Sequence, residues 1–122
     1  MQIHQSAEDY LETILMLNQR MGRVRSIDVV NELGYTKASV SIAMKKLREN
    51  GYIAVDGEGN LTLLEPGREI AERIYSRHRL LTHFFVQLGV EEDIAAEDAC
   101  KAEHILSEQT LEKIREYALL HD

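Results

Sequence analysis

Residues 26–50 decide the fold, and they have the sequence SIDVVNELGYTKASVSIAMKKLREN. Ser26 can cap a brief apolar helix, and Gly34 follows it as a residue able to adopt positive φ in a tight turn. Thr36 can then cap a second helix that ends near Asn50, because apolar side chains recur there at intervals of three and four. Two helices joined by a glycine turn, the second of them cationic, are typical of a helix-turn-helix. The alternative is a helical hairpin of an ordinary bundle.

The start and the outer side of this second helix carry small, hydroxyl and cationic side chains. Small residues let the backbone approach the major groove, hydroxyl groups donate to phosphates or base edges, and lysine neutralises phosphate. We therefore predict that the helix reads DNA. Ala38 can offer only van der Waals contact with a thymine methyl group, or the absence of a clash. The residues predicted to read bases are Thr36, Lys37, Ala38, Ser39 and Ser41, and those predicted to contact phosphates are Arg25, Lys45 and Lys46.

A β-hairpin is predicted directly after that helix. Residues 51–55 and 61–64 have the composition of strands, and residues 56–60 have that of a turn. A hairpin in this place is the wing of a winged helix. Its tip carries two acids and no lysine or arginine, so we expect little phosphate contact from the wing and expect the sheet to close the hydrophobic core instead.

Helices are predicted for most of the remaining chain. One begins after Ser6, a long one covers about residues 67–88, one opens at the acids after Gly89-Val90, and Ser107 caps the last. The predicted fold is mainly α with a small β-hairpin. A winged helix-turn-helix domain (1–72) precedes an α-helical metal-binding and dimerisation domain (73–122), and the long helix is shared. The last helix has more apolar surface than so short a chain can cover, which predicts a homodimer.

Composition limits the class of protein. The chain has 122 residues, of which 44% are apolar and 29% charged, and its net charge is −7. No stretch approaches the roughly 20 apolar residues of a membrane span, and the N-terminus lacks a signal pattern. We therefore expect a cytoplasmic protein without a membrane partner. Residues 20–50 carry seven Lys and Arg against three acids, whereas residues 91–122 carry ten acids against three bases. This polarity suits a polyanion at one end and cations or a protein partner at the other.

Three late polar residues, Cys100, Glu103 and His104, fall at i, i+3 and i+4. On a helix a thiol, a carboxylate and an imidazole then project from one face, which is typical of a divalent-metal site that needs further ligands. The alternative is an ordinary semi-buried helix face. Asp9 and Glu12 share a side of the first helix, where solvated first-turn acids are the alternative to metal ligands.

Three stretches, in this order and spacing, resemble the diphtheria-toxin-repressor family of metal-dependent transcriptional regulators. They are residues 7–12 (AEDYLE), 77–81 (RHRLL) and 98–104 (DACKAEH). The resemblance covers essentially the whole chain and implies a repressor of metal-homeostasis genes. It implies a homodimer bound to a double-stranded, pseudo-palindromic DNA operator. We expect a short form without the SH3-like C-terminal domain of the iron-type members, as in the manganese-type members.

The resemblance also implies a set of metal ligands. Asp9 follows the manganese-type branch of the family and Cys100 the iron-type branch, while Thr82 and Ala96 stand where the iron-type branch supplies further ligands. A thiolate favours Fe(II), Co(II), Ni(II) or Zn(II) over Mn(II). We expect Fe(II) or Mn(II), with Co, Ni, Zn or Cd able to substitute. The principal site implied comprises Asp9, Cys100, Glu103 and His104, and the neighbouring site Glu12 and His78.

Two other functions remain open from the sequence. One is a winged-helix regulator that responds to an organic ligand or to thiol oxidation at Cys100, without metal. The other is a metalloenzyme that uses the same residues around an open coordination position. The sequence supplies no substrate pocket and no general base beyond the ligands themselves, so we predict that the protein is not an enzyme.

Overall fold

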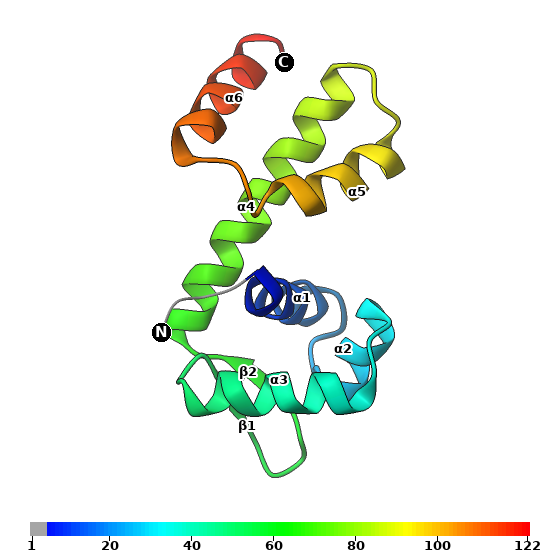
Figure 1. The fold of residues 1–122 in the computed structure, drawn as a ribbon, viewed down its shortest axis with the longest axis vertical. Helices are drawn as coiled ribbons and strands as arrows, with labels where there is room; N and C mark the ends of the chain where they lie inside the picture. Colours follow the sequence, from blue (N-terminus) through cyan, green and yellow to red (C-terminus); the bar gives the residue numbers. More distant parts are fainter. Residues whose placement is uncertain (1–4) are drawn as a thin grey trace. The chain divides into compact units, whose positions relative to one another are not determined.

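The computed structural model describes residues 5–122 of the chain (Figure 1). The chain divides into two compact units, Met1–Glu72 and Arg73–Asp122, which we call the first and the second unit. The described residues are mainly helical with one two-stranded antiparallel sheet, which confirms the predicted fold class. The elements are α1 (Gln5–Met21), α2 (Ser26–Leu33), α3 (Lys37–Glu49), β1 (Ile53–Val55), β2 (Leu61–Leu63), α4 (Glu65–Gln87, with residues in both units), α5 (Glu92–Ala102) and α6 (Glu108–Leu120).

Helices α2 and α3 form the predicted helix-turn-helix. Gly34 ends α2 with φ of 71°, and its N–H donates to the carbonyl oxygen of Val30 at 2.8 Å. Thr36 caps α3, because its hydroxyl oxygen accepts the N–H of Ser39 at 3.1 Å. The expectation that Ser26 caps α2 is wrong. Arg25 is the capping residue, and its N–H donates to the Asp28 carboxylate at 2.9 Å. The inner side of α3 is buried through Val40, Met44 and Leu47.

The wing follows α3 as an antiparallel pair in which Ile53 lies opposite Leu63. Ile53, Leu61 and Leu63 are buried, so the small sheet closes the core of the first unit, as expected. The first strand begins at Ile53 and not at Gly51, because the N–H of Tyr52 donates to the carbonyl oxygen of Leu47 and thereby closes α3.

The turn of the wing is held by one carboxylate. Asp56 accepts the backbone N–H groups of Glu58 and Asn60, each at 2.9 Å, and the Asn60 amide at 3.0 Å. These donors favour the ionised carboxylate, and the backbone N–H of Asn60 contributes most to lowering the pKa of Asp56 below its ordinary value. The turn is therefore stabilised locally, in solvent, by its own backbone.

The start of α4 packs closely against the backbone of Tyr52, which lies between α3 and β1. Pro66 lies in the first turn of α4, where its missing N–H leaves no helical hydrogen bond unmade. A Cβ atom at Gly67 would overlap the carbonyl oxygen of Tyr52, so this position requires glycine. The glycine thus lets the long helix begin directly against the wing.

The second unit consists of the later part of α4 with α5 and α6, packed around Leu81, Ala99 and Leu111. Ser107 caps α6 as predicted, since its hydroxyl oxygen accepts the N–H of Thr110 at 3.2 Å. Much apolar surface stays exposed in this unit, including Leu88, Ile105, Leu119 and Leu120.

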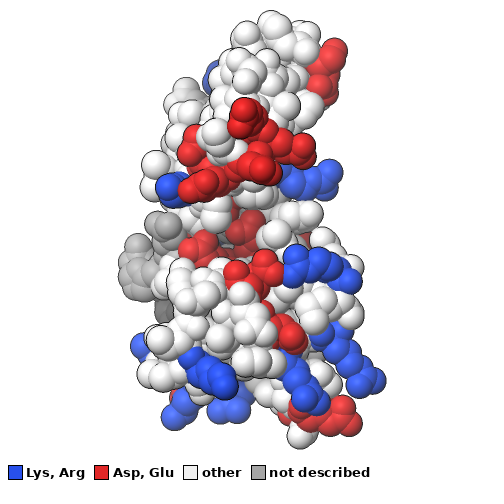
Figure 2. Space-filling model, turned by 90° about the vertical axis from the view of Figure 1, so that its right-hand side faces the viewer, with Lys and Arg blue, Asp and Glu red and all other residues white. Residues whose placement is uncertain are grey.

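The two units differ in charge. On the face drawn in Figure 2, Lys and Arg side chains gather over the part formed by α2, α3 and the wing, and Asp and Glu side chains are prominent over the second unit. Among the helices in the described residues, none has the length and apolar character that crossing a membrane requires.

Candidate functional site

The link between α5 and α6 carries two of the predicted metal ligands. Helix α5 ends at Ala102, and the N–H of Glu103 makes its last helical bond, to Ala99 at 2.9 Å. The carbonyl oxygen of Ala102 then accepts the N–H of Ile105 at 3.1 Å, which closes a turn around His104. The expectation that Cys100, Glu103 and His104 share one face of a continuous helix is therefore wrong, because the helix ends before Glu103 and His104.

Glu103 is the centre of the site in the second unit. Its side chain is fully buried, and one carboxylate oxygen lies 3.0 Å from Nδ1 of His78 in α4. The other oxygen lies 3.4 Å from Nε2 of His104, whose side chain is 1% exposed. A buried carboxylate costs free energy unless charge or hydrogen bonds compensate it. Oxygen and imidazole nitrogen donors in one place are also the set that first-row divalent cations prefer, so these residues fit such a metal ion.

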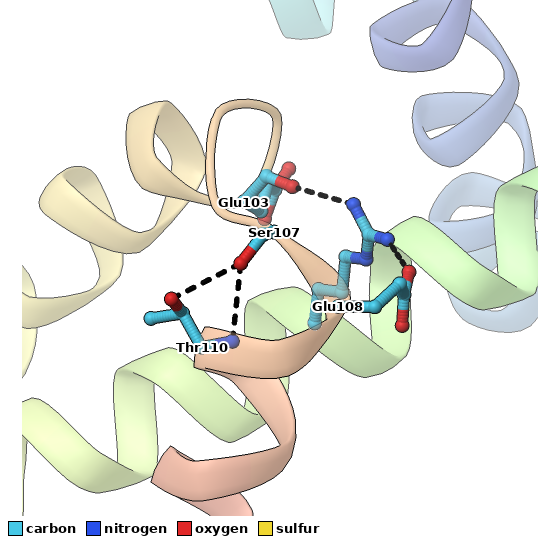
Figure 3. Close-up of polar contacts among 5 residues, drawn as sticks. Glu103, Ser107, Glu108 and Thr110 are labelled. Atoms are coloured by element: carbon cyan, nitrogen blue, oxygen red, sulfur yellow. Dashed lines mark hydrogen bonds and ion pairs between the residues drawn. The ribbon is translucent and has the colours of Figure 1, made fainter.

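Arg77, which precedes His78 in α4, holds this link in place. Its two partners, Glu103 and Glu108, are labelled in Figure 3. Its guanidinium donates to the backbone carbonyl oxygen of Glu103 at 3.2 Å and pairs with the carboxylate of Glu108 at the start of α6. The Arg77 side chain is only 15% exposed. Sequence reasoning did not assign Arg77 a role. The available signal was an arginine at an apolar-face position of the long helix.

The remaining predicted ligands lie on two helices, α5 and α1. Cys100 is exposed on α5, whereas Glu103 is buried. In the first unit, α1 holds Asp9, which is half-buried, and Glu12, which is only 5% exposed. Glu12 is therefore not a solvated acid, whereas the alternative stays open for the half-buried Asp9. The assignment of all six residues as ligands stays a prediction.

Thr82 and Ala96 stand where the iron-type branch of the family supplies further metal ligands, and neither was expected to act as one. The hydroxyl of Thr82 donates to the carbonyl oxygen of His78 at 2.7 Å, within α4. Its proton is thus engaged by the backbone of its own helix. Ala96 has no donor atom in its side chain, so neither residue adds an obvious ligand.

The outer side of α3 presents the predicted DNA contacts. Every residue assigned to bases or phosphates is exposed, namely Arg25, Thr36, Lys37, Ala38, Ser39, Ser41, Lys45 and Lys46. Sequence reasoning missed two neighbours. Ile42 is 58% exposed on the same helix, and Arg48 lines a hollow of about 260 Å³ together with Ser26 and Lys45. The signal for Ile42 was an isoleucine outside the buried three-and-four pattern of α3.

Two consecutive parts of the chain match the two domains of one protein family. Residues 2–61 match the N-terminal DNA-binding domain of the iron-dependent repressor. Residues 64–119 match the metal-binding and dimerisation domain of the same repressor. Together these domains cover nearly the whole chain, and they imply a DNA operator and a homodimer.

Individual relatives agree with this match. An uncharacterized HTH-type transcriptional regulator of Methanocaldococcus jannaschii is 35% identical over 113 residues, which cover 91% of this chain and 90% of the relative. The HTH-type transcriptional regulator MntR of Bacillus subtilis is 33% identical over 109 residues, covering 89% of this chain and 77% of MntR.

Among solved structures, a manganese-dependent transcriptional repressor in complex with manganese superposes with a TM-score of 0.84 at 29% identity, over 92% of this chain. The chain spans about half the length of that solved structure, since the match covers 52% of it. The chain therefore belongs to the iron-dependent repressor family, the diphtheria-toxin-repressor family that the sequence resembles, whose members are metal-dependent DNA-binding transcriptional regulators and not enzymes.

Proposed function

We propose that this chain acts in the cytoplasm as a homodimeric repressor of metal-homeostasis genes, and that Mn(II) or Fe(II) raises its affinity for a DNA operator. The observation that carries the proposal is the buried Glu103 carboxylate between the imidazoles of His78 and His104. A buried carboxylate contributes little to the stability of a fold by itself. A metal-dependent regulator needs it as a ligand for the cation. The similar solved structure, a manganese-dependent transcriptional repressor in complex with manganese, supports the choice of Mn(II).

The proposed ligands are those implied by the family resemblance. His78, Glu103 and His104 bind with imidazole and carboxylate groups of the second unit, and Cys100 adds a thiolate from α5. Asp9 and Glu12 contribute carboxylates from α1 of the first unit. A bound divalent cation supplies positive charge that offsets the mutual repulsion of the carboxylates. Arg77 holds the backbone of Glu103 and so orients its carboxylate.

DNA recognition is assigned to the exposed side of α3. Lys45 and Lys46 neutralise phosphates, with Arg25 before α2. The residues that face the base edges are Thr36, Lys37, Ala38, Ser39 and Ser41. A homodimer presents two such helices, which fit successive major grooves when they are about 34 Å apart. The operator is then a pseudo-palindrome that mirrors the twofold symmetry of the protein. By linkage, metal and DNA raise each other's affinity by the same factor.

Operator titrations test the proposal. A pool of random duplexes is selected with the wild-type protein in the presence of Mn(II), and affinity for the selected duplex is measured anaerobically with Mn(II), Fe(II), Co(II) or a chelator. We expect Mn(II) or Fe(II) to raise the affinity about 5- to 150-fold, as is typical of allosteric coupling. If saturating Mn(II), Fe(II) and Co(II) all leave it unchanged, the proposal is wrong.

The exposure of Cys100 favours one competing function, a regulator that senses thiol oxidation. Alanine variants at Cys100 and His104 separate the two functions. The metal function requires both side chains, so each variant loses metal-dependent DNA binding. Oxidation sensing requires mainly the thiol, so His104→Ala would respond to peroxide as the wild type does.

A further inference from the structure

We propose that Ile42, together with Ala38, reads the 5-methyl group of a thymine in the major groove of the operator. The inference rests on the proposed function, because it concerns the DNA that the repressor selects. It makes Ile42 a specificity-determining residue on α3.

Packing within the folded chain does not account for an isoleucine at position 42. Among the large apolar side chains that the structure describes in the first unit, Ile42 is the most exposed, at 58%. Tyr35 is also exposed, but its ring packs edge-on against Tyr10 with the centroids 6.0 Å apart. A β-branched residue on an exposed helix surface has lower helix propensity than lysine or glutamine, and apolar area left in water contributes no burial energy. Ile42 is therefore available for contact with a partner of the folded chain.

Ile42 lies in the middle of the outer side of α3. Ala38, Ser41, Ile42 and Lys45 follow the spacing i, i+3, i+4 and i+7, so they share one side of the helix. All four are exposed, and the buried residues of α3 lie on the opposite side. Side chains on a helix lean toward its N-terminus, which directs Ile42 over Ala38. The two side chains form a small apolar strip beside the hydroxyl of Ser41 and the cation of Lys45.

The major groove offers one apolar group at its base edges, the 5-methyl group of thymine. Ile42 has no donor or acceptor, so hydrogen bonding cannot be its contribution to base recognition. The exposed cations Lys37, Lys45 and Lys46 complement the phosphates on either side and bring this side of α3 toward the groove. A thymine methyl opposite Ile42 and Ala38 would remove apolar surface of both partners from water.

Deoxyuridine tests the contact, since it differs from thymidine only by the methyl group. Thymines in one half-site of the duplex selected with Mn(II) are replaced one at a time by deoxyuridine. We expect wild-type affinity to fall about fourfold at one position, the effect of roughly one buried methyl-sized contact. Ile42→Ala should bind the unmodified duplex roughly tenfold more weakly, and deoxyuridine at that position should weaken its binding less than it weakens the binding of the wild type, because only Ala38 still contacts the methyl group.

Matched variants keep the test specific. Met21→Ala removes an apolar side chain of similar exposure, 50%, from the last residue of α1 and should behave as the wild type in the whole series. The unfolding midpoint of Ile42→Ala should not fall, because Ile42 is more than half exposed and alanine has the higher helix propensity. If Ile42→Ala binds the selected duplex as the wild type does, or if it keeps the full deoxyuridine penalty at every thymine, the contact does not exist. Metal-dependent binding combined with either result would refute the thymine contact alone, whereas absence of binding with every metal would refute the proposed function as well.

Discussion

Two short connections of the molecule are each built around one carboxylate, and they use it in opposite ways. In the wing of the first unit, Asp56 is exposed and accepts N–H groups from residues two and four positions later. In the link between α5 and α6 of the second unit, Glu103 is fully buried, and its carboxylate contacts the imidazole of His78, which is 25 positions away in the sequence.

The difference separates a structural carboxylate from a functional one. Asp56 stays hydrated, and its hydrogen bonds fix a local turn at little cost. Glu103 loses its hydration, which is costly unless charged or hydrogen-bonding groups around the carboxylate offset it. A residue that costs the fold free energy without ordering its own backbone is best explained by a ligand.

Replacing Glu103 by glutamine should produce the largest effect. The amide keeps the shape of the side chain but removes its charge, so we expect affinity for Mn(II) to fall at least about 100-fold, because loss even of groups that only support metal ligands costs 10- to 100-fold. Metal-free stability should stay equal or rise, since a buried charge is removed. Competition with a coloured chelator measures the first quantity and urea denaturation the second.

Glu116→Gln is the matched control. It makes the same chemical change on α6, where the carboxylate is 57% exposed and pairs with Lys113. We expect unchanged metal affinity. Equal losses in the two variants would show that only the net charge of the second unit matters, and the contrast between Glu103 and Asp56 would then have no functional meaning.

Arg77 tests whether the link must be held in place for Glu103 to bind metal. Arg77→Ala removes the donor to the Glu103 carbonyl oxygen, so we expect roughly tenfold weaker metal binding and a stability loss of about 1–3 kcal/mol. Arg77→Lys keeps one charge but cannot reach both acceptors with a planar fork, and it should recover only part of the affinity. The absorption spectrum of bound Co(II) reports the coordination geometry independently of affinity. A variant that loses stability but keeps the wild-type spectrum and metal affinity would limit Arg77 to a structural role.

The elements predicted well from the sequence are those whose signals are local. Gly34, Thr36 and Ser107 each define a helix end by their own backbone or hydroxyl group, and the structure places those ends as predicted. The end of α5 was not predicted, because no glycine or proline follows Ala102. The ensuing turn is instead held by Arg77, which donates to Glu103 from 26 positions away. Burial of Glu103 against His78 is likewise a tertiary effect.

Ser107→Ala should show how much of the link depends on a local signal. The hydroxyl caps α6, so its loss should cost about 1 kcal/mol of stability. Because Arg77 still holds the backbone of Glu103, we expect metal affinity to change by less than about threefold, a free-energy difference below that of the cap. Thermal unfolding and the chelator competition measure the two effects. A loss of metal affinity comparable to that of Arg77→Ala would show that the cap positions Glu103 as strongly as the guanidinium does.

Asp56→Asn should have the smallest effect, and its dependence on pH should identify its cause. Hydrogen bonds lower the pKa of Asp56 in the folded protein below its value in the unfolded chain. The ionised carboxylate therefore stabilises the wing above the unfolded pKa of about 3.9, and this contribution disappears as the pH falls through the lower, folded pKa. Hydrogen exchange at the amides of Glu58 and Asn60 should be faster in the variant at pH 6, and the protection factors of wild type and variant should converge as the pH falls below the lowered pKa of Asp56. A difference in protection that persists at low pH would show that the shape of the Asp56 side chain, and not its charge, holds the turn. The comparison with Glu103 could then no longer be explained by how the two carboxylate charges are stabilised.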